Sequence, residues 1–541
     1  MRLFPVAGPG TGEMRTRDGV RLVADIWRPE APGRFPVLLM RQPYGRRIAS
    51  TVAYGHPAFY AARGFVVVVQ DVRGTGGSGG SGGAFLAYAN EAEDGADAIA
   101  WAASLPQGNG RVGMYGFSYQ GAAQTLALSQ APPALGAIAP AMAIWDLRGE
   151  RAGERFALAG NASWAAQVGA IRARHAGDAA AYAELAAASN AIRFDGAVPA
   201  DPEVLRRHAS LHHFALWRDA PPGDAYWQRA SSAARMAGCA ARVPAFFTGG
   251  WFDYHLAGTV AGFRALAGTS LLMIGPWVHL QWAPCGAGAD FGPAAQSDVD
   301  SMQAGFFAHA LADADPPPWM AEARVRLFDL TRRAWRLFDS WPEPPPRVLH
   351  LAGDGLAAVR EDGGRLQDAP PSALHHERFV HDPWRPAPSF GLHHGGGFAD
   401  RSAVDARFDI ACFTTTPFVA PLPLAGTPRA EIAVEAEAAS FDLHATLSLL
   451  LPDGRALPVS DGMARAASAG VLSIPLRPLC LTVEPGHRLR LSLAGASFPA
   501  HAVNPGTGAD PLRATAAEAV PISYAIACGG AAPSRLLLPA G

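Results

Sequence analysis

The sequence predicts an α/β domain with a mostly parallel sheet, a helical insertion within it, and an all-β domain after it. Up to about residue 345, short apolar runs bounded by Gly and Pro alternate with helical patterns, which is typical of parallel strands covered on both faces. Residues 146–240 are rich in Ala, Arg, His and Trp and show helical spacing without a convincing strand. Beyond the PEPPPR segment at 342–347, period-two runs separated by turn signals recur, which favours a β-sandwich.

The chain of 541 residues is too long for a single hydrophobic core, so several domains are expected. We place the α/β domain at residues 1–145 and 241–345, the helical insertion at 146–240, and the β domain at 346–541.

Individual elements follow from the same patterns. The α/β domain is predicted to contain strands at 20–29, 36–40, 65–70, 111–118, 242–253 and 270–279, with helices at 90–105, after residue 118, and at 256–268. The β domain is predicted to contain strands at 407–415, 430–438, 444–452, 487–495 and 524–528.

Composition excludes several classes of function. The net charge is -2, and all 45 basic residues are arginine. Without lysine there is no Schiff-base or serine-lysine chemistry, and the Gly-rich segment 71–83 cannot be a P-loop. The sequence has no cluster of basic residues, so neither nucleic acid nor a membrane is predicted as a partner. The five cysteines are scattered, which predicts free thiols. No apolar stretch suggests a signal peptide or membrane span, so we expect a cytoplasmic enzyme without metal or cofactor and leave a homo-oligomer open.

Three serines compete as the nucleophile. The nucleophile elbow of α/β-hydrolases is usually G-x-S-x-G, and Ser78 and Ser81 in DVRGTGGSGGSGG match it literally. Both serines lie in a long loop that we expect to be mobile, and neither begins a helix. Ser118 in VGMYGFSYQG has its second glycine one residue late. It nevertheless ends a strand and precedes a helix at once, where helix N-terminal charge favours a developing oxyanion, so Ser118 is the candidate.

An acid and a base follow Ser118 in the order that this fold requires, Ser, then Asp or Glu, then His. Asp253 closes the strand VPAFFTGGWFD, and His279 closes LLMIGPWVH. Because parallel strands present their carboxyl ends at one edge of a sheet, both side chains are expected beside Ser118. Taken singly, Asp253 is equally well a helix cap and His279 a packed loop histidine.

Together these segments resemble the family of bacterial cocaine esterase, α-amino acid ester hydrolases, glutaryl acylases and X-prolyl dipeptidyl peptidases. The resemblance is carried by MRTRDGVRLVADIWRP, RQPYG, GFVVVVQDVRG, GFSYQG, GGWFD and GPWVH, and in the β domain by HDPWRPAPSFG and EPGHRLRLSLAGASFPAHAVNPGTG. It implies an α/β-hydrolase fold with a helical cap and a C-terminal jelly roll. It also implies the elbow G-x-S-Y-x-G, the triad Ser118, Asp253 and His279, and an oxyanion hole made of the Tyr44 phenol and the Tyr119 N–H.

The resulting hypothesis is a serine hydrolase that cleaves small carboxylic esters or amides through an acyl-enzyme on Ser118. An X-prolyl peptidase and a β-lactam acylase remain alternatives, as does a carbohydrate-binding β domain on an inactive hydrolase domain. Relatives that accept an α-amino group carry acids where this chain has His255 and Leu256, although Glu150 or Asp178 of the insertion could substitute for them. The predicted substrate pocket comprises His255, Trp145, Trp164 and Trp217.

Two histidine-rich motifs are set aside. HHGGG at 393–397 follows the triad, whereas the oxyanion loop of lipases precedes the elbow. HHERFVH at 375–381 has one residue too many for H-E-x-x-H and no helical context.

Overall fold

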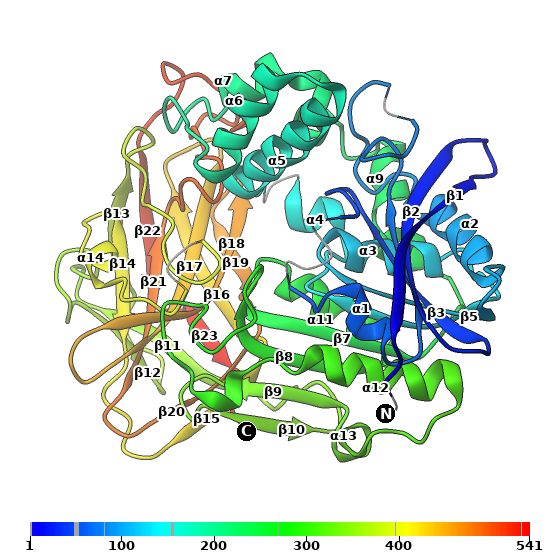
Figure 1. Ribbon diagram of the computed structural model, residues 1–541. Coiled ribbons are helices and arrows are strands. Elements are labelled where there is room, and N and C mark those ends of the chain that lie inside the picture. The colour runs from blue at the N-terminus through cyan, green and yellow to red at the C-terminus, as the bar shows by residue number, and fades with distance from the viewer. Residues whose placement is uncertain are drawn as a thin grey trace.

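The computed structural model describes residues 3–47, 53–80, 82–152, 156–268, 270–394, 397–531 and 533–541. Ser81 therefore lies outside the described residues. Three regions are visible in Figure 1: a sheet with its helices in blue to green, a group of teal helices above it, and a β-rich region in yellow to red beside both.

The N-terminal sheet contains ten strands in the order β1-β2-β4-β3-β5-β6-β7-β8-β9-β10 among the described residues. Neighbours from β4 to β9 pair in parallel, while β1, β2 and β10 pair antiparallel at the two edges. The strands are β1 Val6–Arg15, β2 Arg21–Pro29, β3 Phe35–Gln42, β4 Val66–Asp71, β5 Gly108–Phe117, β6 Leu135–Ala141, β7 Ala245–Phe252, β8 Ser270–Val278, β9 Val325–Asp329 and β10 Ala334–Phe338.

Helices cover both faces of this sheet. In β4, Val66 and Val68 pack with the helices α2 and α3, whereas Val67 and Val69 pack with α1 and α12. This alternation explains the continuous apolar run, because each face of a doubly covered strand must be apolar. The helices are α1 Pro57–Ala61, α2 Glu91–Ala103, α3 Tyr119–Leu128, α11 Leu256–Ala265, α12 Val299–Ala312 and α13 Pro318–Glu322.

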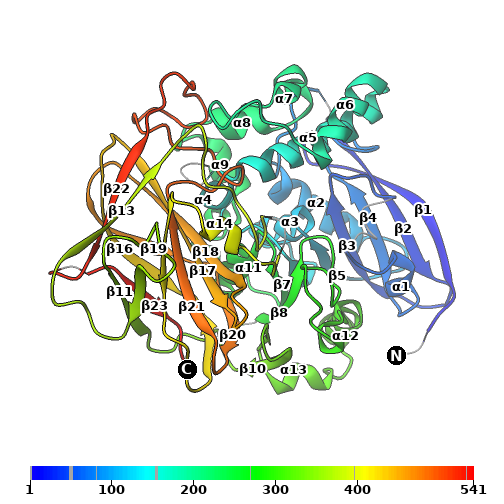
Figure 2. The same ribbon diagram turned by 90° about the vertical axis from the view of Figure 1, so that its left-hand side faces the viewer.

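Between β6 and β7 the chain leaves the sheet and forms a helical cap. Its elements are α4 Leu147–Arg151, α5 Leu158–Ala176, α6 Ala179–Asn190, α7 Glu203–Arg207, η3 Ala209–Leu211, α8 Phe214–Asp219, α9 Ala225–Ala230 and α10 Ser232–Met236. Figure 2 shows α5 and α6 lying over the sheet domain. The helical character predicted for this segment is present, while the exact domain boundaries stay predictions.

The β domain is dominated by one eleven-stranded sheet among the described residues, with a separate pair of strands, β15 and β20. The strands are β11 Arg347–Gly353, β12 Gly364–Gln367, β13 His375–His381, β14 Ile410–Thr414, β15 Leu422–Gly426, β16 Arg429–Ala436, β17 Phe441–Leu450, β18 Ala456–Ala466, β19 Gly470–Pro475, β20 Leu479–Val483, β21 Arg488–Ala494, β22 Ile522–Cys528 and β23 Arg535–Leu538. A short helix, α14 Ser402–Asp405, precedes β14. The jelly-roll connectivity stays a prediction.

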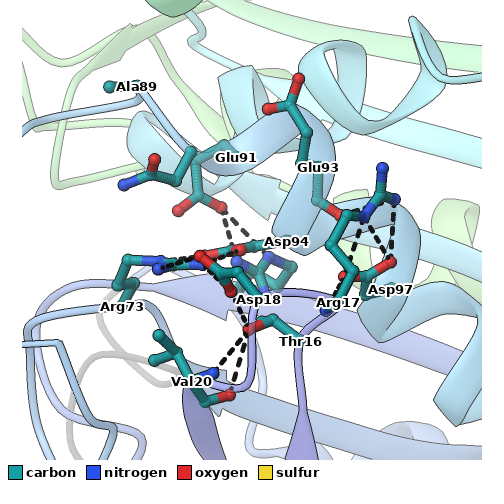
Figure 3. Close-up of polar contacts among 12 residues, drawn as sticks. Thr16, Arg17, Asp18, Val20, Arg73, Ala89, Glu91, Glu93, Asp94 and Asp97 are labelled. Carbon is teal, nitrogen blue, oxygen red and sulfur yellow. Dashed lines mark hydrogen bonds and ion pairs between the residues drawn. The ribbon is translucent and has the colours of Figure 1, made fainter.

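The Gly-rich loop after β4 is tied to its surroundings, in contrast to the expected mobility. Arg73 pairs with Asp94 of α2 at 2.6 Å and with Asp18 at 2.8 Å (Figure 3). The Ser78 hydroxyl donates to the Asp71 main-chain oxygen at 2.7 Å and accepts the Val23 N–H at 3.0 Å. Ser78 is thus already engaged in structural hydrogen bonds and lies in a loop rather than at a helix start.

Within the described ranges, no helix is both long and apolar enough to cross a membrane. The described cysteines are free, and Cys412, Cys480 and Cys528 are buried, as the sequence predicts.

Candidate active site

Ser118 lies between β5 and α3 in a backbone conformation that residues other than glycine rarely adopt. It is the N-cap of α3 with φ 60° and ψ −124°, and it is 8% exposed. Such positive-φ geometry in a non-glycine residue costs energy and is held only where the surrounding structure determines it. The strand-turn-helix context predicted for Ser118 is therefore present, together with the backbone strain of a nucleophile elbow.

The two nearby glycines explain the displaced motif. A Cβ at Gly116 would approach Cβ of Gln120 to 2.4 Å, and a Cβ at Gly121 would approach the Ala141 oxygen to 2.9 Å. At position 120 the side chain is accommodated, because Gln120 Oε1 accepts the Phe117 N–H at 3.1 Å. In this chain, the position after the serine that has no room for a side chain is residue 121, where α3 passes the end of β6.

Asp253 and His279 follow β7 and β8, and the structure brings them together. His279 Nδ1 lies 2.6 Å from Asp253 Oδ1, and the Asp253 side chain is fully buried. Asp253 Oδ2 accepts the His255 N–H at 3.0 Å. With Nδ1 directed at the carboxylate, the other ring nitrogen of His279 remains to act on a substrate or nucleophile.

The β domain contacts the loop that carries Asp253. The Arg477 guanidinium, in the segment between β19 and β20, donates to the main-chain oxygens of Asp253 and of Trp251. Arg477 could not be identified from the sequence, because a contact between residues more than two hundred positions apart leaves no local pattern. Arg477 gives the β domain a direct part in fixing the loop that carries Asp253.

Tyr44 lies just past β3, at the same sheet edge. The Trp164 indole N–H, which can only donate, gives a hydrogen bond of 3.1 Å to the Tyr44 oxygen. The phenolic hydrogen of Tyr44 is therefore free to point elsewhere. Burial raises the pKa of Tyr44 to about 12, while interactions with Trp164 and Ser118 lower it in part, so this phenol keeps its proton at neutral pH.

Tyr119 begins α3. Its side chain is buried away from the cavity, where the hydroxyl donates to Glu91 Oε1 at 3.1 Å and the ring stacks on Tyr88 with centroids 4.3 Å apart. Its backbone N–H belongs to the first turn of the helix, where N–H groups have no intrahelical acceptor. This geometry suits a main-chain donor next to Ser118.

A cavity of about 820 Å³ lies between the sheet edge and the cap. Its lining includes Ser118, His279, Tyr44, His255, Trp164 and Trp217. The cavity thus brings together Ser118, His279 and three of the four predicted pocket residues. Trp217 donates to the Tyr226 hydroxyl at 2.6 Å, and its ring centroid lies 5.4 Å from that of Trp164.

Trp145 differs from the expectation. It does not belong to the residues that line the cavity, and its ring lies against α11, where a Cβ on Gly262 would come within 3.1 Å of it. The helical spacing of tryptophans in the insertion could not distinguish a cavity wall from a packed residue, because both sites are apolar.

The carboxylates that could substitute for a missing acid cluster are engaged elsewhere. Asp178 caps α6 by accepting the Ala181 N–H at 3.0 Å. Glu150 Oε1 accepts the main-chain N–H groups of Trp145 and Asp146, both at 2.8 Å. Among the described residues that line the cavity, the acidic one is Asp71, which pairs with Arg46 at 2.7 Å.

One group of side chains could in principle bind a cation. His393, His394 and Asp461 place ligand atoms within 4.8 Å of one another, and His394 Nε2 lies 3.0 Å from Asp461 Oδ2. Arg477 lies 3.6 Å from the other oxygen of Asp461 and already supplies positive charge there. These residues include the start of the HHGGG motif, whose residues 395 and 396 lie outside the described ranges.

Comparison with known proteins identifies the family to which the chain belongs. Residues 18–281 match the family described as X-Pro dipeptidyl-peptidase (S15 family), and residues 317–537 match its C-terminal non-catalytic domain. Cocaine esterase of Rhodococcus sp. (strain MB1 Bresler) is 31% identical over 97% of this chain and 96% of its own length. The chain belongs to the cocaine esterase and S15 family of serine hydrolases.

Solved structures of the same architecture agree with the fold of this serine hydrolase. An α-amino acid ester hydrolase superposes with a TM-score of 0.76 at 21% identity, covering 99% of this chain and 98% of the other. An aminopeptidase from a Thaumarchaeota archaeon gives a TM-score of 0.79 at 22% identity, covering 98% and 96%. The predicted α/β-hydrolase fold with a C-terminal β domain is thereby confirmed.

Proposed function

We propose that this serine hydrolase cleaves small carboxylic esters through an acyl-enzyme on Ser118. The observation that carries the proposal is the 2.6 Å contact between His279 Nδ1 and buried Asp253, with His279 lining the cavity that Ser118 also lines. Three groups in the order nucleophile, acid and base, each just past the end of a parallel strand of the same sheet, suit acyl transfer.

The reaction begins with proton transfer. His279 takes the Ser118 proton while the Ser118 oxygen bonds to the ester carbonyl carbon, and Asp253 stabilises the imidazolium. The carbonyl oxygen then carries negative charge and accepts hydrogen bonds that the Tyr44 phenol and the Tyr119 N–H donate. As the carbon–oxygen bond to the leaving group breaks, His279 returns the proton to the departing alcohol.

Deacylation reverses the roles with water as the nucleophile. His279 takes a proton from water, the hydroxide adds to the acyl carbon, and the bond to Ser118 breaks as His279 protonates the serine oxygen. The products are a carboxylic acid and free enzyme. Apart from the substrate and water, these steps use only groups of the chain itself.

Peptidase activity on substrates with a free amino terminus is the alternative that the cavity supports less. A protonated amine needs a carboxylate partner in a buried site, and the cavity-lining Asp71 is already paired with Arg46. Cleavage of β-lactam side-chain amides by the same acyl-enzyme is a further alternative.

One panel tests these proposals. The enzyme is treated with a fluorophosphonate probe and assayed with aryl esters, X-Pro anilides and a β-lactam amide. We expect labelling at Ser118 and turnover of the esters well above that of the anilides. Failure of the probe to label Ser118 would sink the acyl-enzyme and favour a binding role, for which a glycan array tests the β domain. Faster cleavage of X-Pro anilides than of esters would assign the peptidase activity instead.

A further inference from the structure

One buried arginine faces the cavity without a carboxylate partner. Arg151 ends α4, is 7% exposed, and lines the same cavity as Ser118 and His279. Within the described ranges its guanidinium has neither an ion pair nor a hydrogen bond to another residue. Buried arginines are nearly always paired, because a desolvated charge without a counter-charge is costly.

The other buried arginines of the described chain each have a hydrogen-bonding partner, a carboxylate in three of them. Arg41 pairs with Glu91 at 3.0 Å, Arg401 with Asp405 at 3.0 Å, and Arg490 with Glu361 at 2.7 Å. Arg172 donates to main-chain oxygens, among them that of Gly83 at 2.7 Å. The unpaired guanidinium is thus specific to the position beside the active site.

The neighbouring acid does not neutralise Arg151. Glu150 directs one oxygen to two main-chain N–H groups and the other toward His255 Nδ1 at 3.8 Å. Burial raises the pKa of Glu150 to about 8, so this side chain is mostly neutral at pH 7. Among the described residues, none thus supplies a full counter-charge to Arg151, and the cavity that it lines has room for one.

An aromatic ring lies beside the Arg151 guanidinium. The guanidinium carbon lies over the Tyr254 ring, 5.1 Å from its centroid, in a cation–π contact that supplies no counter-charge. Tyr254 in turn lies 4.2 Å from the His279 ring, measured between centroids. Arg151 therefore approaches the reactive histidine through one intervening aromatic ring.

The cap helix α5 makes room for this arginine. A Cβ on Gly160 would lie 3.2 Å from Arg151 Nη1. Gly160 shares a helix face with Trp164, Gln167 and Ile171, which line the cavity. The first turn of α5 also carries partial positive charge, so helix and guanidinium together favour an anion at the inner end of that face.

We propose that Arg151 binds an anionic group of the substrate, so that the natural substrates are esters that carry a carboxylate in addition to the scissile carbonyl. The planar guanidinium edge matches a carboxylate in a bidentate contact. This inference rests on the proposed esterase function and adds to it the charge class of the substrate.

The test uses matched pairs of esters that differ only in charge. One pair is para-acetoxybenzoate and para-acetoxybenzamide, with the charge on the leaving group. The other is the mono-para-nitrophenyl ester of adipic acid and its terminal amide, with the charge on the acyl chain. The quantity compared is the ratio of kcat/KM for the carboxylate to kcat/KM for the amide.

We expect this ratio to fall about 10- to 100-fold in Arg151→Gln for at least one pair, and to be partly kept in Arg151→Lys, as for the loss of a charge-assisted hydrogen bond. Arg174→Gln is the matched control, since Arg174 also lines the cavity but lies on its exposed side. There the ratio should change less than threefold, because exposed charges are screened.

The outcomes separate the two levels of the proposal. An unchanged ratio for both pairs in Arg151→Gln overturns the inference, and so does an equal fall in Arg174→Gln, which would indicate a diffuse positive field. If the neutral amides are hydrolysed through Ser118 in either case, the esterase function stands without the inference. If the wild type hydrolyses no ester of either pair, the proposed function fails and the inference fails with it.

Discussion

The two sides of the cavity are built in different ways. On the sheet side, Ser118, Asp253 and His279 follow β5, β7 and β8, so the hydrogen-bonded strands fix the position of their backbone. On the cap side, Arg151 and Trp164 come from helices of an insertion, which pack in one core cluster with the segment 85–92 and with α3. The difference suggests that the sheet side performs a reaction common to the family, while the cap side selects the substrate.

Replacing the nucleophile tests the sheet side with the largest expected effect. Ser118→Ala should lower kcat for an aryl ester by about 10⁶-fold, the scale seen when a serine nucleophile is removed, and should abolish labelling by a fluorophosphonate. Thermal unfolding of the variant checks that the fold persists. Release of backbone strain is not expected, since alanine meets the same positive φ.

Ser78→Ala is the matched control, because Ser78 satisfies the literal G-x-S-x-G pattern. We expect unchanged kcat and a loss of stability of about 1 kcal/mol from its two structural hydrogen bonds. Loss of turnover in Ser78→Ala with activity retained in Ser118→Ala would reverse the assignment of the nucleophile.

The proposed oxyanion donor, Tyr44, is expected to give the next largest effect. Tyr44→Phe removes the phenolic hydrogen and keeps the ring, so kcat and kcat/KM should fall together by about 10²- to 10³-fold. Since the pKa of Tyr44 is raised to about 12, ionisation of this phenol should cause no loss of wild-type activity up to about pH 10. Unchanged turnover in Tyr44→Phe would remove this residue from the proposed mechanism.

The same division explains what the sequence could predict. Ser118, Asp253 and His279 each end an apolar run of a strand, and parallel strands deliver their ends to one edge, so local pattern and topology together predict the Asp253–His279 contact that the structure contains. The sequence also shows that the second glycine of the motif, Gly121, comes one residue late. The physical reason, its close approach to Ala141, required coordinates.

The cap side could not be predicted in the same way. Arg151 looks like any surface arginine of a helical segment, and its burial depends on α5, Gly160 and Tyr254 meeting in three dimensions. Trp145, Trp164 and Trp217 have similar local patterns, yet Trp164 and Trp217 line the cavity and Trp145 packs on α11. Helical spacing indicates which residues are buried together without indicating which of them surround an empty space.

A smaller effect tests the contact that joins the two sides. Trp164→Phe removes the indole N–H that bonds the Tyr44 oxygen, so the phenol loses orientation but not its proton. We expect kcat to fall about 2- to 10-fold, the scale of one neutral hydrogen bond. In a Tyr44→Phe background the same change should leave kcat unaffected, because the coupled group is gone. An equal loss in both backgrounds would mean that Trp164 acts only as a cavity wall.

The smallest effect concerns stability and pH at the junction of cap and sheet. Burial raises the pKa of Glu150 from 4.5 to about 8, so the folded protein holds this proton more tightly than the unfolded chain does. Its contribution to stability is therefore full below pH 4.5 and is lost as the pH rises through about 8.

The variant Glu150→Gln tests this pH dependence, because it keeps an oxygen for the N–H groups of Trp145 and Asp146 and cannot ionise. Differential scanning calorimetry from pH 5 to 9 should show the variant gaining a few degrees in Tm over wild type as the pH rises. A constant difference in Tm across this range would mean that Glu150 keeps one protonation state throughout, and its pKa would then not lie between pH 5 and 9.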